Sequence, residues 1–215
     1  MSELVFPDSL GYADLATLVR RGRGADPDGA VRLQVLGSTL AVWVAVLPGT
    51  GLFAEGSALG VRGLHLAQPA ELDVVVTSAA LADRFARDGD GATRLAVPPA
   101  NVRASWSGAL PALSGWSSDG ELAAAELVEV ARAGIAEIGE AAAVGASAGS
   151  LAVQALRTTV WARAIPTTGS APVPAGAAFA AYVLGFVRPN DASVRVSRSG
   201  WWVRLTTRGG DVIAR

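Results

Sequence analysis

Cysteine and lysine are both absent from this 215-residue chain, and histidine occurs once, at His65. Without cysteine there is no thiol nucleophile, disulfide, zinc–thiolate site or iron–sulfur cluster. Without lysine there is no Schiff-base lysine and no lysine to hold the phosphates of a nucleotide in a P-loop. A metal site with two histidine ligands would need two chains. We therefore expect no cofactor and no metal site. These absences favour a protein that is not an enzyme, but they do not exclude one.

Charged side chains are scarce as well. They make up 17% of the chain against 51% hydrophobic residues, and the formal net charge is −1. Such a chain can bury a sizeable core and does not have the composition of a disordered protein. The N-terminal segment MSELVFPDSLGYADL lacks the apolar region of a signal peptide. Prolines interrupt the apolar stretches 33–54 and 164–187 short of the roughly 20 residues that span a bilayer. We expect a soluble, cytoplasmic protein without membrane association.

The fold class predicted for the whole chain is α+β. Residues 1–106 are expected to form a mostly antiparallel sheet with one or two helices. The run VRLQVLGSTLAVWVAVL indicates two strands joined at Gly37–Ser38. Further strands are expected at 58–66, 71–76, 93–98 and 101–106. The expected helices are 10–23, with Asp8 or Ser9 as N-cap and Gly24 past its end, and 79–87, capped by Thr77 or Ser78.

A stretch rich in glycine, serine and proline, residues 107–118, is predicted to link this domain to a second one at 119–215. Ser118 and Glu121 have the spacing of a capping box, which predicts a long helix at 119–143. A second helix is expected at 147–163, and a third, apolar nearly all round and therefore buried, at 175–187. The chain should end in a small three-stranded β-meander.

Three short motifs resemble functional sites, and we interpret each as ordinary structure. Gly49, Gly51 and Ala54 have the spacing of a dinucleotide-binding turn, but a β-like pattern follows where a helix is needed, so a loop between antiparallel strands is expected. GASAG at 145–149 matches a nucleophile elbow but follows a predicted helix, so Gly145 should end one helix and Ser147 cap the next. DGDGAT at 88–93 lacks the later ligands of a calcium loop and is expected to be a turn. His65 alternates with Leu64 and Leu66, which places it on the outer face of a strand.

The C-terminal meander combines arginine with tryptophan. From residue 192 to the end there are five arginines and one acid, Asp211. Strand alternation with a two-residue turn near Ser199 places Trp202 on the same face as several polar residues, and Trp201 on the opposite, inward face. Arginine can bind phosphates and tryptophan can stack on bases. The candidate nucleic-acid-binding residues are Arg195, Arg198, Trp202, Arg204 and Arg208.

Several phrases carry a family resemblance: YADLATLVRRGRGADPDGAVRLQ, LAVWVAVLPGTGL, VPAGAAFAAYVLGFV and SGWWVRLTTRGGDVIAR. The chain resembles a group of uncharacterised actinobacterial proteins with a domain of unknown function at each end. The resemblance covers nearly the whole length and implies a cytoplasmic bacterial protein whose two halves belong together. It implies no catalytic residue, cofactor or substrate.

Three functions therefore stay open. The leading hypothesis is a non-catalytic binding or interaction module that self-associates as a homo-oligomer, because six tryptophans are many for this length and tryptophan favours interfaces. The second is binding of nucleic acid through the meander, and a protein partner is a further possibility. The third is an enzyme that acts on a small anionic substrate with carboxylate and arginine side chains, for which Glu71, Asp73, Asp83 and Arg62 are available.

Overall fold

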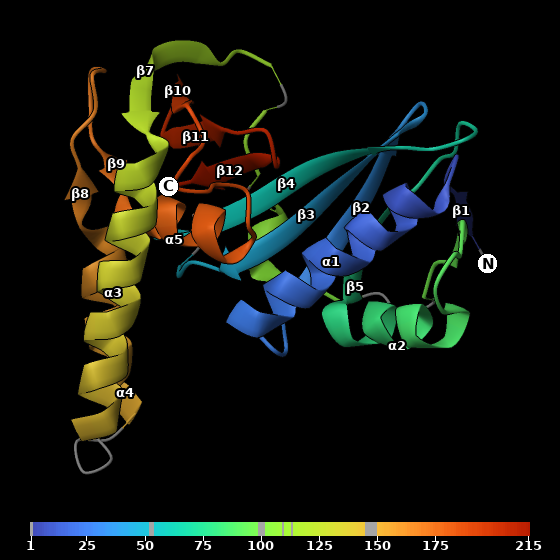
Figure 1. The fold of residues 1–215 in the computed structure, drawn as a ribbon, viewed down its shortest axis with the longest axis horizontal. Coiled ribbons are helices and arrows are strands. Elements are labelled where there is room, and N and C mark those ends of the chain that lie inside the picture. Colours follow the sequence, from blue (N-terminus) through green and yellow to red (C-terminus); the bar gives the residue numbers. More distant parts are fainter. Residues whose placement is uncertain (1, 52–53, 99–101, 109, 113, 145–149) are drawn as a thin grey trace.

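Eight strands form one antiparallel sheet that runs through both halves of the chain (Figure 1). The computed structural model describes residues 2–51, 54–98, 102–108, 110–112, 114–144 and 150–215. Across the sheet the strands follow in the order β5 (Asp73–Thr77), β2 (Ala30–Leu36), β3 (Thr39–Leu47), β4 (Ala58–His65), β12 (Asp211–Ala214), β11 (Trp202–Thr206), β10 (Ser193–Ser199) and β7 (Ser117–Ala123).

One pattern of connections occurs in each half: a helix followed by a three-stranded antiparallel meander. In the first half α1 (Ser9–Ala25) precedes β2, β3 and β4, and in the second half α5 (Ala175–Val183) precedes β10, β11 and β12. The last strands of the two meanders, β4 and β12, pair antiparallel with each other, with Leu59 opposite Ile213. The two meanders therefore meet at the centre of the sheet.

The remaining helices and short strands lie around this sheet (Figure 1). α2 (Ser78–Asp88) packs against α1, and α3 (Ala124–Val144) with α4 (Ser150–Ala162) forms a helical hairpin beside α5. β1 (Glu3–Val5) pairs with β6 (Arg94–Ala96), and β8 (Ala164–Ile165) pairs with β9 (Val173–Pro174). A single turn of 3-10 helix, η1 (Ser105–Gly108), lies between the halves in sequence.

Local sequence signals explain where the first two helices begin. The Asp8 carboxylate accepts hydrogen bonds from the N–H groups of Leu10 and Gly11, and the Thr77 hydroxyl accepts one from Ala80. These N-caps satisfy donors that the first turn of a helix leaves without partners. Both predicted helices and both capping sites are confirmed. Gly24, which was expected past the end of α1, lies inside that helix.

The two faces of the sheet bury different residues. On the front face, α1 and α5 cover an aliphatic core that includes Leu33, Val42 and Val196. On the back face there is a second core of Trp43, Ala45, Leu59, Trp106, Trp202 and Ile213. Strand alternation explains this division, because Val42 and Val44 point forward while Trp43 and Ala45 point backward. Trp106 belongs to η1, so the segment between the halves covers the back of the sheet.

Hydrogen bonds from neighbouring loops partly cover the two edges of the sheet. At β7 the Glu121 N–H donates to the Thr168 hydroxyl (3.0 Å). At β5 the Val75 carbonyl accepts from the Val102 N–H (3.1 Å). Exposed edge strands invite pairing with other chains, so these contacts make edge-to-edge association unfavourable.

The α+β class is confirmed, but the arrangement of the second half differs from the prediction. Its meander is not a separate small unit, because β12 continues the N-terminal sheet. Residues 119–123, predicted as the start of a helix, belong to β7 together with the last two residues of the predicted linker, and the helix begins at Ala124. The expected strand at 101–106 is instead irregular backbone leading into η1 where it is described. The third helix ends at Val183, before Gly185 in the left-handed region (φ 67°).

Within the described residues, no helix is long and apolar enough to cross a membrane. The motif GASAG at 145–149, with its predicted helix end and cap, lies outside the described residues. Gly49, Gly51 and Ala54 lie in the loop between the antiparallel strands β3 and β4, as predicted, and the next described element after them is the strand β4. His65 is exposed between buried Leu64 and Leu66, which confirms the predicted outward orientation.

Candidate functional site

The five candidate residues of the C-terminal meander do not share one exposed surface. Strand alternation places Arg195, Trp202 and Arg204 on the back face of the sheet. It places Arg198 on the front face, with Val194 and Val196. Arg208 belongs to the turn between β11 and β12. Each of them has a different environment.

Two of the five candidate residues, Trp202 and Arg204, pack against other residues of the protein. Trp202 is only 9% exposed, because it packs in the back-face core with Trp43 and Trp106. The Arg204 guanidinium lies over the Trp116 ring, 4.7 Å from its centroid. Neither the indole of Trp202 nor the covered face of Arg204 is therefore available to stack on a base. The fully solvated tryptophan is Trp201, 82% exposed at the β10–β11 turn, so the prediction that it packs inward is wrong. It occupies the turn itself, where strand alternation no longer applies.

Arg198 is a structural residue that ties three segments together. Its guanidinium pairs with the Asp119 carboxylate of β7 and donates to the carbonyls of Ala171 and Pro172. The same carboxylate accepts the backbone N–H of Ser170 (2.8 Å). The hydrogen bonds from Ser170, together with Arg198, lower the pKa of Asp119 from 3.8 to about 2. This network holds β10, β7 and the loop before β9 in register.

Arg195 and Arg208 remain exposed. Arg195 pairs with Thr206, two residues before Arg208, so both cations lie at the same end of the meander. Binding of nucleic acid stays a prediction that now rests on these two side chains. Its signature is an affinity that falls steeply as salt rises.

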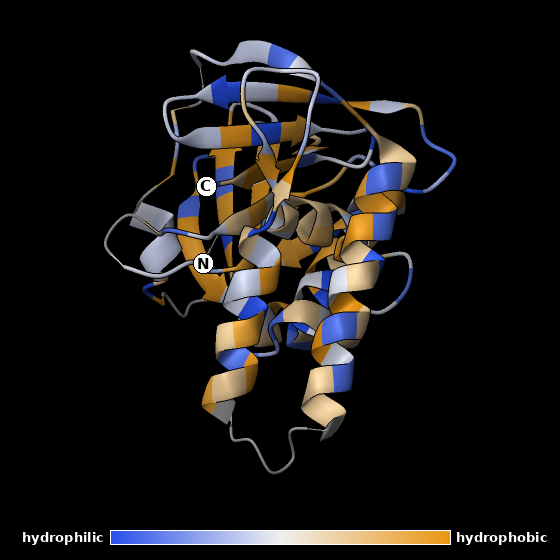
Figure 2. Cartoon of the chain, turned by 90° about the vertical axis from the view of Figure 1, so that its left-hand side faces the viewer, coloured by the Kyte–Doolittle hydropathy of each residue, from blue (hydrophilic) through white to orange (hydrophobic). Residues whose placement is uncertain are grey.

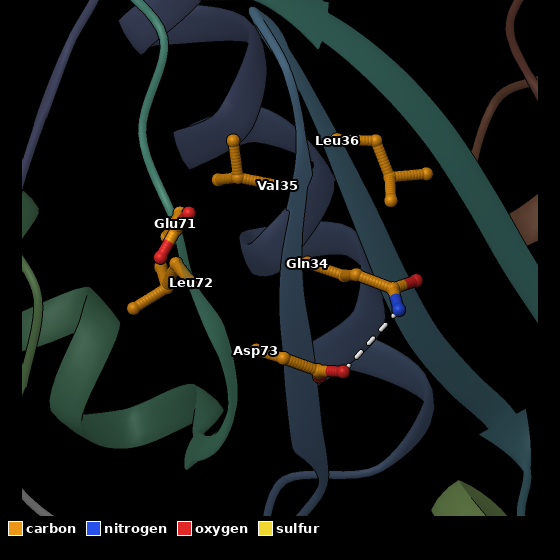
Figure 3. A pocket seen from close by; sticks show the side chains of 6 residues that line it. All are labelled: Gln34, Val35, Leu36, Glu71, Leu72 and Asp73. Atoms are coloured by element: carbon orange, nitrogen blue, oxygen red, sulfur yellow. Dashed lines mark hydrogen bonds between the residues drawn. The ribbon is translucent and has the colours of Figure 1, made fainter.

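The carboxylate and arginine residues available to an enzyme do not converge. Asp73 accepts two hydrogen bonds of 2.7 Å from Arg32 and one of 3.2 Å from Gln34, and the Arg32 bond lowers the pKa of Asp73. Figure 3 shows the shallow depression beside it, with Glu71 at its border. Arg62 pairs instead with Asp14 of α1 (2.6 Å), and Asp83 is exposed on α2.

The buried Tyr12 also has a hydrogen-bond partner within the protein. The Tyr12 hydroxyl donates to the Asp88 carboxylate (2.7 Å), and burial together with this bond raises the pKa of Tyr12. The phenol therefore stays protonated and does not supply a base. In the part of the chain that the structure describes, no three acidic or histidine side chains are grouped as a metal site would require.

Sequence reasoning missed two features of α4. Its inner side, with Arg157 and Trp161, borders a cleft of about 380 Å³ whose other wall is the β3–β4 loop and the end of α1. Its outer side carries only uncharged residues. The one signal in the sequence was that Arg157 is the sole charged residue of SLAVQALRTTVWA. Gly49, the first residue of the motif that resembles a dinucleotide turn, lines this cleft, whereas Gly51 and Ala54 are not among its lining residues.

Two family models match the chain, one to each half. Residues 1–108 match the model described as Domain of unknown function (DUF8010), and residues 111–215 match Domain of unknown function (DUF8185). The resemblance to proteins with a domain of unknown function at each end is thereby confirmed. No curated protein matches the chain.

Proposed function

Because the chain belongs to the family described as Domain of unknown function (DUF8010), which assigns no activity, we propose a function from the geometry alone. The protein is a non-catalytic interaction module that pairs with a second copy of itself. The contact surface is the outer face of α4, defined by Leu151, Ala152, Ala155, Thr158, Thr159 and Ala162. The observation that supports this proposal is that this exposed helix face carries no charged side chain.

Every residue of the α4 outer face is exposed and none is charged. Leu151 is 84% exposed, the most exposed of the large hydrophobic side chains described. The two threonine hydroxyls donate to backbone carbonyls of their own helix, Thr158 to Gln154 and Thr159 to Ala155, at 3.1 Å each. Their donors are therefore satisfied internally, and an uncharged strip remains along α4. Figure 2 shows that the α3–α4 hairpin projects from the sheet.

A second copy fits this strip better than an unrelated partner, because the strip is complementary to itself. When two α4 helices pair antiparallel around a two-fold axis near residues 156 and 157, Leu151 of one copy faces Ala162 of the other. Ala155 then faces Thr158. A large side chain meets a small one at each end, and the small central residues let the helices approach closely. With no charge on the strip, like copies do not repel each other.

The size of the surface predicts a modest association. At 1.5 Å per residue, the 13 residues of α4 span about 20 Å, and one helix is about 10 Å wide. The α4 outer face therefore offers about 200 Å² per partner, which is smaller than most specific interfaces. We expect a dimer that dissociates on dilution.

Other routes to self-association are less favourable. Both sheet edges are partly covered by neighbouring loops. The tryptophans that suggested an interface are mostly internal, since Trp43, Trp106, Trp116 and Trp202 gather on the back of the sheet within one chain. Trp201 is a single exposed residue rather than a patch.

Sedimentation velocity over a wide range of protein concentration tests the proposal. The native chain is expected to shift from monomer to dimer, and Ala155→Glu is expected to weaken the dimer at least about tenfold, because it places like charges near the two-fold axis. Leu10→Glu is the matched control, since Leu10 is 75% exposed on α1 and should leave the dimer unchanged. A native chain that stays monomeric at high concentration, or an Ala155→Glu variant that dimerises normally, would overturn the proposal.

A further inference from the structure

We propose that the cleft between α4, the end of α1 and the β3–β4 loop binds a small zwitterion of the α-amino-acid class. The cleft holds about 380 Å³, within the range of small-molecule sites. Residues from both family domains line it, among them Asp26, Leu47, Glu55, Gln154, Arg157 and Trp161. The cleft and the proposed dimer surface meet at Thr158 and Ala162, but Arg157 and Trp161 belong to the cleft alone. Leu151, Ala152, Ala155 and Thr159 of the dimer surface do not line the cleft.

The described part of the loop that forms one wall has a defined shape. Thr50 and Glu55 exchange two backbone hydrogen bonds of 2.9 Å. Gly49 has φ 76°, and a Cβ there would lie 2.6 Å from the Ala54 carbonyl oxygen, so only glycine fits. Ala54, buried beneath the turn, itself has φ 52°, a conformation that alanine rarely adopts. The loop therefore fixes Glu55 at the rim of the cleft.

A buried hydrogen-bond donor borders the cleft. Trp161 is 5% exposed and its ring stacks on Phe179, with centroids 4.3 Å apart. Among the described residues its indole N–H finds no acceptor. Buried donors without partners are rare because they destabilise the fold. Solvent does not reach this nitrogen, so Trp161 offers a ligand the part of its ring that borders the cleft, not its N–H.

The charges around the cleft have both signs. Arg157 is half-buried and makes no hydrogen bond or ion pair within the described part of the chain. Across from α4 are Glu55 and Asp26. Asp26 caps the C-terminal end of α1, and its carboxylate accepts the Asp28 N–H (3.3 Å). Helix C-termini favour positive charge. A simple anion would be repelled by the carboxylates and a simple cation by Arg157. A molecule with one carboxylate and one ammonium group matches both, and its side chain meets Val46, Leu47 and Pro48.

Thermal shift and isothermal titration calorimetry with each natural α-amino acid test the inference on the full chain. At least one is expected to bind saturably and to raise Tm. Its N-acetyl derivative, which lacks the ammonium, and its methyl ester, which lacks the carboxylate, are each expected to bind at least tenfold more weakly. Absence of any Tm shift or heat with the whole set would overturn the proposal, as would equal binding of either derivative.

Variants separate the cleft from the rest of the surface. Arg157→Gln is expected to weaken binding at least tenfold, whereas Arg103→Gln, which removes an exposed arginine outside the cleft, should leave it unchanged. Ala155→Glu is expected to bind like the native chain, because Ala155 does not line the cleft. Failure of the dimer and failure of the site are therefore distinguishable. An Arg157→Gln variant that folds normally and binds as well as the native chain would contradict the assignment.

Discussion

Asp119 illustrates how a single side chain takes its role from tertiary contacts. Its carboxylate accepts the Ser170 N–H and pairs with Arg198, and both contacts favour the ionised form. Arg198 was a candidate ligand of nucleic acid on the basis of its position in a basic segment. The sequence around it gives no hint of Asp119, which lies 79 positions earlier. A charge pattern along one strand predicts which side chains are cationic, but not which of them already have a partner.

The lowered pKa of Asp119 predicts a specific dependence of stability on pH. Since the pKa falls from 3.8 to about 2 on folding, the ionised carboxylate stabilises the protein above about pH 4. This contribution is lost as the pH falls from about 4 through about 2. In urea unfolding, Asp119→Asn should therefore be less stable than the native chain at neutral pH, and the difference should shrink below pH 4. Asp83→Asn, at an exposed position on α2, is the control and should show no such convergence.

The segment between the two halves of the chain also takes its role from tertiary contacts, as Asp119 does. Its glycine, serine and proline content indicated a linker, and that composition does produce mostly irregular backbone at 102–116 where it is described. However, Trp106 is buried against both Trp43 and Trp202, one from each half. The Arg32 guanidinium also donates to the Ser107 carbonyl (3.3 Å). The segment therefore fastens the halves together, which its composition alone did not reveal.

Truncating Trp106 should show how much this segment contributes to the stability of the folded chain. Trp106→Ala is expected to lower the free energy of unfolding by about 3–5 kcal/mol, because it removes a large buried side chain from the back-face core and leaves a cavity. Trp201→Ala changes the same residue type at an exposed turn and should alter stability by no more than about 0.5 kcal/mol. Chemical denaturation followed by circular dichroism compares the two. Equal effects of both substitutions would contradict a structural role for Trp106.

Local sequence patterns predicted most of the helices and strands. They failed where contacts between residues distant in sequence determine the structure. The hairpin at Gly37–Ser38 and the meander at the C-terminus carry strong periodicity, and the third helix is apolar nearly all round; all three form. At 117–123, Ser118 and Glu121 imitate a capping box. The segment becomes a strand because it pairs with β10, and because Thr168 and Arg198 bond to it from elsewhere. The cleft was equally hidden, since Asp26, Glu55 and Arg157 meet only in the folded chain.

At the scale of the whole molecule, the continuous sheet couples the two family domains. The backbone pairing of β4 with β12 and the two cores on either face all cross the boundary between them. If either half unfolded alone, it would leave a central strand of the other without its partner and expose apolar surface on both faces.

We therefore expect the full chain to unfold in one transition. Tryptophan fluorescence, which reports on the back-face core, and far-ultraviolet circular dichroism, which reports on all the helices and strands, should give the same midpoint in urea. The calorimetric and van't Hoff enthalpies should also agree. Two resolved transitions, one for each half, would show instead that the shared sheet does not couple them.

The antiparallel meeting of β4 and β12 also bears on how such a chain could have arisen. Each meander contributes its last strand to the junction, and antiparallel pairing relates the two strands by a local two-fold axis. An ancestral polypeptide with a single helix and meander would complete the same junction by binding an identical neighbour. Gene duplication followed by fusion would then convert that dimer into one continuous chain. Afterwards the segment carrying Trp106 and Trp116 would be free to evolve as the covering of the former subunit boundary.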